Sequence, residues 1–185
     1  MRDLSLHLLD LAQNSITAGA SLVTVGLFLE ENGMLTMRLE DDGKGMDKEL
    51  LERVTSPFAT TRTTRKVGLG IPMMKENAEK AGGSFSLESE VGKGTVLTAT
   101  LDTKNIDCLP LGDLSGTLLS LMLTNPLHPD FLFEGKSPKG EDTFDTREVR
   151  AALGSDIPFN EPSVAAWLKE ALDEVINSIF GGVLI

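Results

Sequence analysis

The sequence predicts an α+β fold in which helices cover one face of a mixed or antiparallel sheet, followed by a small C-terminal α/β appendage. The first hundred residues read as helix, two strands, helix, loop, helix and two strands, which is not a serial strand–helix–strand order. After Leu101, polar residues mixed with Gly and Pro interrupt this pattern before a second set of elements begins. We therefore expect a two-layer α/β sandwich in the first part.

Apolar spacing separates the helices of the first part from its strands. Between residues 4 and 19, apolar side chains recur with a helical period, and Gly19 supplies the stop. Two further helices are predicted by "DKELLERV", with Asp47 as its cap, and by "IPMMKENAEKAGG". Alternating segments predict strands, which are "SLVTVGLFLE", "GMLTMRLED", "SFSLESE" and "TVLTATL". The turns "ENG" and "VGKG" would join them as two hairpins.

The second part has a different character, with 14 acidic against 6 basic residues from Asp102 onward. Its segments "TLLSLMLT", "DFLFEG" and "EDTFDT" predict a small sheet, and two helices follow. The first helix has Asp145 and Glu148 in a capping-box arrangement, and the second opens at Pro162. We expect one domain at residues 1–101, a linker at 102–116, and a small acidic α/β domain at 117–185.

Composition excludes several classes of function. The net charge of −11 argues against DNA, RNA or an anionic membrane as the main partner, because these need a basic footprint. The sequence has no apolar run of about eighteen residues and no signal segment at Met1. The single cysteine, Cys108, fits a reducing compartment. A cytoplasmic location is expected.

Two glycine motifs and one asparagine could carry chemistry. In "GLGIPM", Gly68 and Gly70 precede a helix whose positive end could receive an anion, although an ordinary helix start has the same appearance. In "DDGKG", a carboxylate at a strand end could accept a hydrogen bond from an exocyclic amine, and a common turn is the alternative. Asn14 lies one helical turn after Asp10, where an amide oxygen could complete a Mg²⁺ shell.

In combination, these motifs carry a family resemblance. "LLDLAQNSITAGA", "DDGKGM", "SPFATTR", "GLGIPMMK" and "GKGT" resemble, in order and spacing, the sequence boxes of one ATPase superfamily. That superfamily comprises DNA gyrase B subunits, ninety-kilodalton heat-shock chaperones, sensor histidine kinases and MutL mismatch-repair proteins, the GHKL or Bergerat-fold ATPases. The likeness covers residues 4–101, and no family is suggested for the remainder.

The resemblance implies a role for individual residues. Asn14 would ligate Mg²⁺, Asp41 would receive the adenine amino group, and Asp10 would be the general base. The other implied contacts to ATP come from the base pocket, the lid hinge, the lid cations and the phosphate loop, namely Gly43, Gly45, Thr95, Phe58, Arg62, Arg65, Lys66, Gly68 and Gly70. A solvated loop is the alternative for the three cations.

The chain departs from the family pattern at positions that concern the reaction. Where hydrolytic members have glutamate, this chain has the shorter Asp10. The helix pair that carries the phosphoacceptor of a sensor kinase is not expected, since three residues precede Leu4. His7 is expected to be a polar neighbour of the phosphates or a surface histidine.

The leading hypothesis is a regulatory ATP·Mg²⁺-binding protein kinase or ATPase that acts in signal transduction, organised like the anti-sigma-factor serine kinases. It would transfer the γ-phosphoryl group to water or to a protein acceptor. The alternative is a non-hydrolysing ATP-dependent switch that binds a protein partner through its C-terminal domain. Formation of a homodimer is left open.

Overall fold

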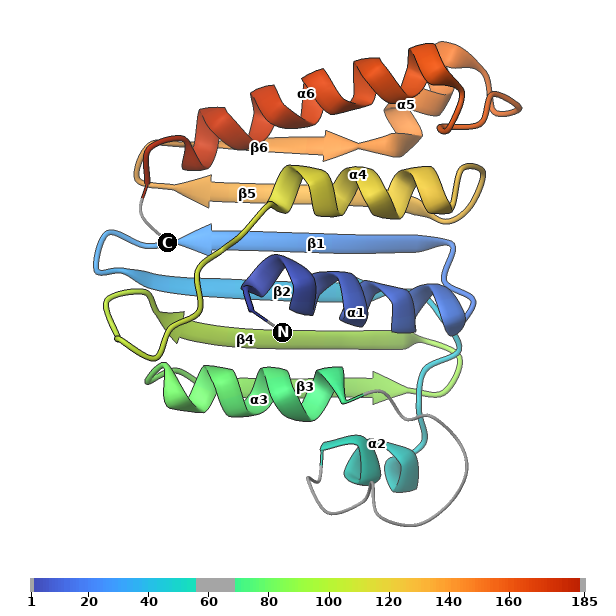
Figure 1. Ribbon diagram of the computed structural model, residues 1–185. Coiled ribbons are helices and arrows are strands. Elements are labelled where there is room, and N and C mark those ends of the chain that lie inside the picture. The colour runs from blue at the N-terminus through green and yellow to red at the C-terminus, as the bar shows by residue number, and fades with distance from the viewer. Residues whose placement is uncertain (1, 56–68, 184–185) are drawn as a thin grey trace.

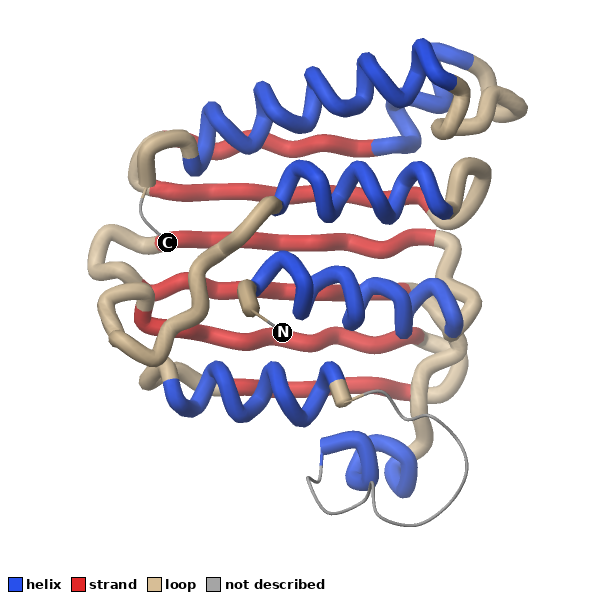
Figure 2. Tube along the Cα trace, viewed as in Figure 1, coloured by secondary structure: helices blue, strands red, loops and turns tan. Residues whose placement is uncertain are grey.

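The computed structural model describes residues 2–55 and 69–183 and consists of a six-stranded mixed sheet with helices packed on it. The strand order is β3-β4-β2-β1-β5-β6. Figure 1 shows α6, α4, α1 and α3 side by side on one face of this sheet, and Figure 2 shows the same two layers by element type. The predicted fold class, a two-layer α/β sandwich, is confirmed.

In the first part of the chain, the helices and strands follow one another in the predicted order. The helices in the described ranges are α1 (Leu4–Thr17), α2 (Lys48–Thr55), α3 (Gly70–Lys80), α4 (Leu114–Thr124), α5 (Thr146–Leu153) and α6 (Pro162–Phe180). The strands there are β1 (Leu22–Leu29), β2 (Met34–Asp41), β3 (Phe85–Glu90), β4 (Gly94–Asp102), β5 (Asp130–Ser137) and β6 (Gly140–Asp145).

Side-chain caps fix where several helices begin. The Asp3 carboxylate accepts a hydrogen bond from the Leu6 N–H at 2.9 Å, so α1 starts at Leu4. Asp47 and Asp145 do the same for α2 and α5, and both caps were predicted from the sequence. Pro162 is the first residue of α6, as expected.

The C-terminal strands extend the main sheet and do not form a small sheet of their own. β5 pairs with β6 in antiparallel fashion and with β1 in parallel, where Leu22 lies opposite Asp130 and Phe28 opposite Lys136. The run "TLLSLMLT", which was grouped with this small sheet, belongs to α4. The topology explains this helix. β4 and β5 run in the same direction with β2 and β1 between them, so the chain that joins them needs a long crossover, which usually contains a helix.

One apolar core lies between the sheet and the helix layer. Alternate residues of the central strands point into it, and it includes side chains from both parts of the chain. The fully buried members with the largest side chains include Leu4, Leu8, Leu27, Leu35, Met74, Leu101, Leu118, Leu121, Phe131, Phe133 and Phe159.

The segment between β4 and α4 lies along the start of α1. The Leu4 N–H donates to the Pro110 carbonyl oxygen at 2.9 Å, and the Ser5 hydroxyl donates to the Leu111 carbonyl oxygen at 2.6 Å. This segment corresponds to the predicted linker at 102–116. The proposed division into two domains remains a prediction.

No helix in the described ranges combines the length and the apolar character that crossing a membrane requires.

Candidate functional site

A cavity of about 260 Å³ opens beneath the C-terminal half of α1, between the ends of β2 and β4, α2 and the first residues of α3. Most of its wall is apolar, from Leu11, Leu39, Met46, Leu50, Leu87 and Leu97. Its polar atoms come from Asn14, Ser15, Asp41, Lys44 and Thr95. An apolar slot with a few directed polar groups is the usual form of a site for a flat organic ligand.

Asp41 supplies the buried carboxylate of this cavity. It is the last residue of β2 and is 8% exposed. Its Oδ2 accepts a hydrogen bond from the Ser15 hydroxyl at 2.6 Å, and its Oδ1 accepts one from the Gly43 N–H at 2.9 Å. These two donors hold the side chain in one orientation, and each carboxylate oxygen can accept a further hydrogen bond from a ligand.

The neighbouring Asp42 has a different role from Asp41. Its carboxylate does not line the cavity and accepts hydrogen bonds from the Ser21 N–H at 2.7 Å and the Leu22 N–H at 2.9 Å. Although partial burial acts in the opposite direction, the hydrogen bonds from Ser21 and Leu22 lower the pKa of Asp42. Asp42 therefore secures the start of β1, and Asp41 is the acceptor that faces the cavity.

The glycines of "DDGKG" allow the loop after β2 to pass close to two other segments. Gly45 has φ of +65°, and a Cβ there would lie 2.0 Å from the Glu90 carbonyl oxygen. A Cβ at Gly43 would crowd Asp41 Oδ1 and Ala18. The loop is thus held between the end of α1 and the hairpin that joins β3 to β4.

Thr95 lies directly opposite Asp41 in the pairing of β2 with β4, so both line the same end of the cavity. Its hydroxyl is 2.9 Å from the Ser89 hydroxyl, which also accepts a hydrogen bond from the Met46 N–H at 2.8 Å. Sequence reasoning missed Ser89 and Ser15. Their roles are visible only from their hydrogen bonds in the folded chain. Ser15 bonds to Asp41, and Ser89 bonds to Met46 and Thr95.

Asp10 and Asn14 lie on successive turns of α1. Asn14 is exposed and lines the cavity, whereas Asp10 is half-buried beside the first residue of α3. A Cβ on Gly70 would lie 2.0 Å from Asp10 Oδ2, so any other residue there would require the Asp10 carboxylate to move. Leu69, at the N-cap of α3, gives the helix no side-chain cap. The structure thus brings Asn14, Asp41, Gly45 and Thr95 to the wall of one cavity, whereas Asp10 and Gly70 lie against each other and do not line it.

His7 does not occupy the position expected for it. It is 0% exposed, and its Nε2 lies 2.8 Å from Asn77 Nδ2 on α3. The prediction that His7 is a surface histidine or a neighbour of the phosphates is therefore wrong, because the side chain is buried against α3. A position on α1 two turns before Asn14 faces the neighbouring helix rather than the solvent, which a helical period alone does not reveal.

The remaining predicted site residues are Phe58, Arg62, Arg65, Lys66 and Gly68, and they lie outside the described residues.

A Mg²⁺ ion would have few protein ligands at this site. Within 2–55 and 69–183, no group of three or more His, Cys, Asp or Glu side chains is suited to hold a metal. The amide of Asn14 fits a hard cation whose other ligands are phosphate oxygens and water. The apolar slot and the buried Asp41 likewise fit a nucleotide base.

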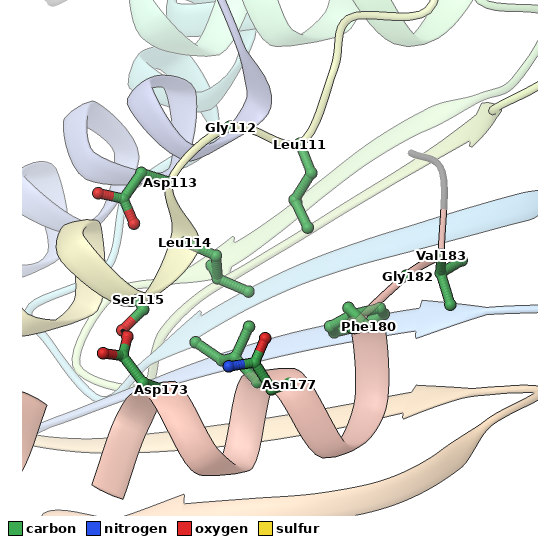
Figure 3. Close-up of a pocket in the computed structure, with 12 residues that line it drawn as sticks. Leu111, Gly112, Asp113, Leu114, Ser115, Asp173, Asn177, Phe180, Gly182 and Val183 are labelled. Carbon is green, nitrogen blue, oxygen red and sulfur yellow. Dashed lines mark hydrogen bonds between the residues drawn. The ribbon is translucent and has the colours of Figure 1, made fainter. Parts of the chain in front are cut away.

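A second cavity, of about 390 Å³, lies where the start of α4 meets the end of α6. Figure 3 shows Asp113 and Ser115 on one side of it and Asp173 and Asn177 on the other, with the Ser115 hydroxyl bonded to the Asp173 carboxylate. Those predicted site residues that the structure describes do not line it.

Comparison with known families agrees with the geometry of the first cavity. Residues 2–105 match the family model described as histidine kinase-, DNA gyrase B- and HSP90-like ATPase. This match spans more than half of the chain. The protein therefore belongs to this ATPase family, as its sequence motifs indicated.

Individual relatives share the same part of the chain. Sensor kinase CckA of Brucella abortus is 32% identical over 110 residues, which are 51% of this chain and 12% of that protein. Sporulation kinase D of Bacillus subtilis is 37% identical over 65 residues, or 35% of this chain and 13% of that protein. The chain thus spans only a small fraction of the length of the curated relatives it matches.

A solved structure resembles nearly the whole chain. It is the crystal structure of the N-terminal domain of a DNA repair protein, with a TM-score of 0.54 and 15% sequence identity. The alignment covers 98% of this chain and 58% of that one. At this identity the likeness shows the fold alone.

Proposed function

We propose that this protein binds ATP with Mg²⁺ in the cavity beneath α1 and uses it for phosphoryl transfer in a regulatory role in the cytoplasm. The observation that carries the proposal is Asp41, a buried carboxylate fixed by Ser15 and Gly43 at the base of an apolar slot. A carboxylate in this setting can accept a hydrogen bond from the exocyclic amino group of adenine, while Gly45 and Thr95 would shape the pocket around the ring.

The opposite end of the cavity suits the phosphates. The start of α3 carries the positive end of a helix dipole and has no side-chain cap from Leu69, so its first N–H groups favour an anion. Asn14 would hold Mg²⁺, which would neutralise phosphate charge. In this proposal Gly68 and Gly70 contact the phosphates, Arg62, Arg65 and Lys66 answer their charge, and Phe58 forms the hinge of the lid.

Asp10 would act as the general base for the attacking group. It stands one helical turn before Asn14 and lies against Gly70 at the start of α3. The acceptor would be water or a side chain of a protein partner, and the C-terminal part would engage that partner. A homodimer is compatible with this scheme, whereas nucleic acids and membranes are not proposed as partners because of the charge of −11.

A second candidate is a non-hydrolysing switch, in which ATP binding changes the surface offered to a partner. The contact between Asp10 and Gly70 favours it, because the short carboxylate already lies against the start of α3. A glutamate would extend about one methylene further toward an attacking water. In the switch, binding energy moves a conformational equilibrium and no bond is broken.

Asp41→Asn tests the binding site, with Asp42→Asn as a matched control. By calorimetry, Asp41→Asn should weaken ATP binding by on the order of 1–3 kcal/mol, because the adenine amino group loses its charged acceptor. Asp42→Asn makes the same chemical change one residue away, outside the cavity, and should keep the affinity. Equal losses in both variants, or no loss in Asp41→Asn, would refute the base pocket.

Turnover separates the enzyme from the switch. The protein is incubated with γ-labelled ATP and Mg²⁺, with and without candidate acceptor proteins. Phosphate release or label transfer that disappears in Asp10→Ala supports the enzyme and eliminates the switch. Tight binding without turnover under every condition eliminates the enzyme.

A further inference from the structure

His7 is a fully buried polar residue outside the cavity, at the contact between two helices. It lies in the second turn of α1 and is 0% exposed. α1 and α3 run side by side in opposite directions on the sheet (Figure 1). The partner of His7 on α3 is Asn77, two turns beyond Gly70.

The hydrogen bonding of this histidine is incomplete. Nε2 lies 2.8 Å from Asn77 Nδ2, and the amide NH₂ can only donate, so Nε2 is the acceptor. The proton of the neutral ring is then on Nδ1, which is buried and has no partner. Burial lowers the pKa of His7, which keeps the ring in this neutral form.

An unpartnered buried nitrogen costs stability that an apolar side chain would not. Leucine would fill a similar space between Leu4, Leu8 and Leu11, which are all buried on α1. Packing therefore does not account for a histidine here. What the ring adds is a directional contact, which fixes how far α3 slides and rotates against α1.

The same two helices also meet at the phosphate end of the cavity. Gly70, Met74 and Asn77 share one face of α3, and Gly70 lies against Asp10. A displacement of α3 at Asn77 would therefore carry its first turn away from Asp10 and Asn14. Small displacements of reacting groups have large effects on binding and rate.

We propose that His7 and Asn77 are positioning residues, which hold the first turn of α3 in place against Asp10 and Asn14 so that it can receive the phosphates of the nucleotide. This inference rests on the proposed function, since it assigns the start of α3 to the phosphates.

The experiment compares His7→Leu, His7→Gln and the wild-type protein. In the nucleotide-free protein, amide hydrogen exchange in the first turn of α3 should become faster in His7→Leu. The ratio of the Kd for AMP to the Kd for ATP should fall about tenfold, with AMP binding unchanged. His7→Gln keeps a side-chain amide that can pair with Asn77 and should restore much of both values.

Ser5→Ala is the matched control. Ser5 is buried on the same helix, but its hydroxyl bonds to the Leu111 carbonyl oxygen and not to α3. Removing that bond should lower the stability of the protein and leave the ratio of the two Kd values as in the wild type. If His7 had only a structural role, His7→Leu would likewise leave the ratio of the two Kd values as in the wild type.

Three results would overturn the proposal, and they differ in meaning. Unchanged exchange in α3 shows that His7 does not hold the helix, whatever the ligand. Faster exchange with an unchanged Kd ratio shows that His7 stabilises the fold only. A wild-type protein that binds neither nucleotide refutes the proposed function itself, and the positioning role with it.

Discussion

Two adjacent carboxylates, Asp41 and Asp42, show how the backbone gives the same side chain two roles. β2 alternates between the helix layer and the open face of the sheet, and Asp41 occupies a buried position at its end. Asp42 follows where the strand has ended, and its carboxylate turns to the backbone of Ser21 and Leu22. The Asp41 carboxylate thus accepts hydrogen bonds from Ser15 and Gly43, and the Asp42 carboxylate accepts them from Ser21 and Leu22.

The lowered pKa of Asp42 predicts a pH dependence of stability. Because its folded pKa is below the unfolded value of about 3.9, the unfolded chain takes up the proton first as pH falls. The stabilisation is therefore complete above that value and is lost as pH falls through the folded pKa. Urea unfolding between pH 7 and pH 3 should show Asp42→Asn less stable than wild type at neutral pH, with a gap that begins to narrow below about pH 4. A gap that widens in acid would contradict this sign.

Gly45 predicts a steric limit on the pocket, with Gly92 as its control. Both have positive φ, but a Cβ at Gly92 meets nothing within 4 Å, whereas one at Gly45 meets the Glu90 backbone at 2.0 Å. Gly92→Ala should cost about 1–2 kcal/mol of unfolding free energy from backbone strain alone. Gly45→Ala should cost about 1–3 kcal/mol more and abolish ATP binding. Similar losses in both variants would show that the loop can move aside.

The sequence predicted the residues of the site that belong to contiguous motifs. Asp41, Gly45, Thr95 and Asn14 each stand in a short glycine or helix pattern, and the structure places them around one cavity. Ser15, Ser89 and His7 could not be assigned this way. Their partners lie 26, 43 and 70 residues away in the sequence, so only the folded chain brings them together.

Among the elements, α5 is attached to β5 by an ionic contact in addition to the hydrogen bonds of Thr146 with Asp130 and Phe131. The Arg150 Nε donates to Asp130 Oδ1 at 2.7 Å, and its guanidinium lies 3.9 Å from the centre of the Phe159 ring. The Arg150 side chain is 11% exposed. Arg150 therefore joins α5 to the start of β5 and to the segment that leads into α6.

Arg150→Met should destabilise the protein by about 2–4 kcal/mol, because Asp130 would be left partly buried without its cation. Arg147→Met is the matched control on the same helix. Arg147 pairs with Asp145 at the surface, with half of its side chain exposed, and its loss should change little. Thermal unfolding measures both. A small effect at Arg150 would mean that Phe159 and the helix cap hold α5 alone.

The C-terminal strands illustrate what local patterns do not contain. Alternation predicted β5 and β6 as strands, and the structure agrees. Their pairing was predicted within a separate small sheet, whereas β5 lies beside β1. The choice of a neighbouring strand depends on which edge the folded sheet leaves open and on the crossover that reaches it. The alternation of apolar and polar residues along a strand contains neither piece of information.

For the whole molecule, the parallel pairing of β1 with β5 predicts how the two parts depend on each other. A fragment of residues 1–105 would leave β1 as an edge strand and remove Leu114, Leu118 and Leu121 from the core. We expect it to unfold at lower urea concentration than the full chain, or to aggregate in size-exclusion chromatography. Cooperative unfolding at the full chain's urea midpoint would instead support two independent domains.

The alternation of β2 also limits how this family member can change by insertion. Asp41 faces the helix layer because one residue, Glu40, separates it from the buried Leu39, so the side chains of Asp41 and Leu39 lie on the same face of the sheet. One residue added within β2 would turn Asp41 to the open face, together with every side chain between the insertion and the strand end. Two added residues would restore it. Relatives in which this carboxylate faces the cavity should therefore tolerate length changes in the turn at residues 30–33 and resist single insertions inside the strand.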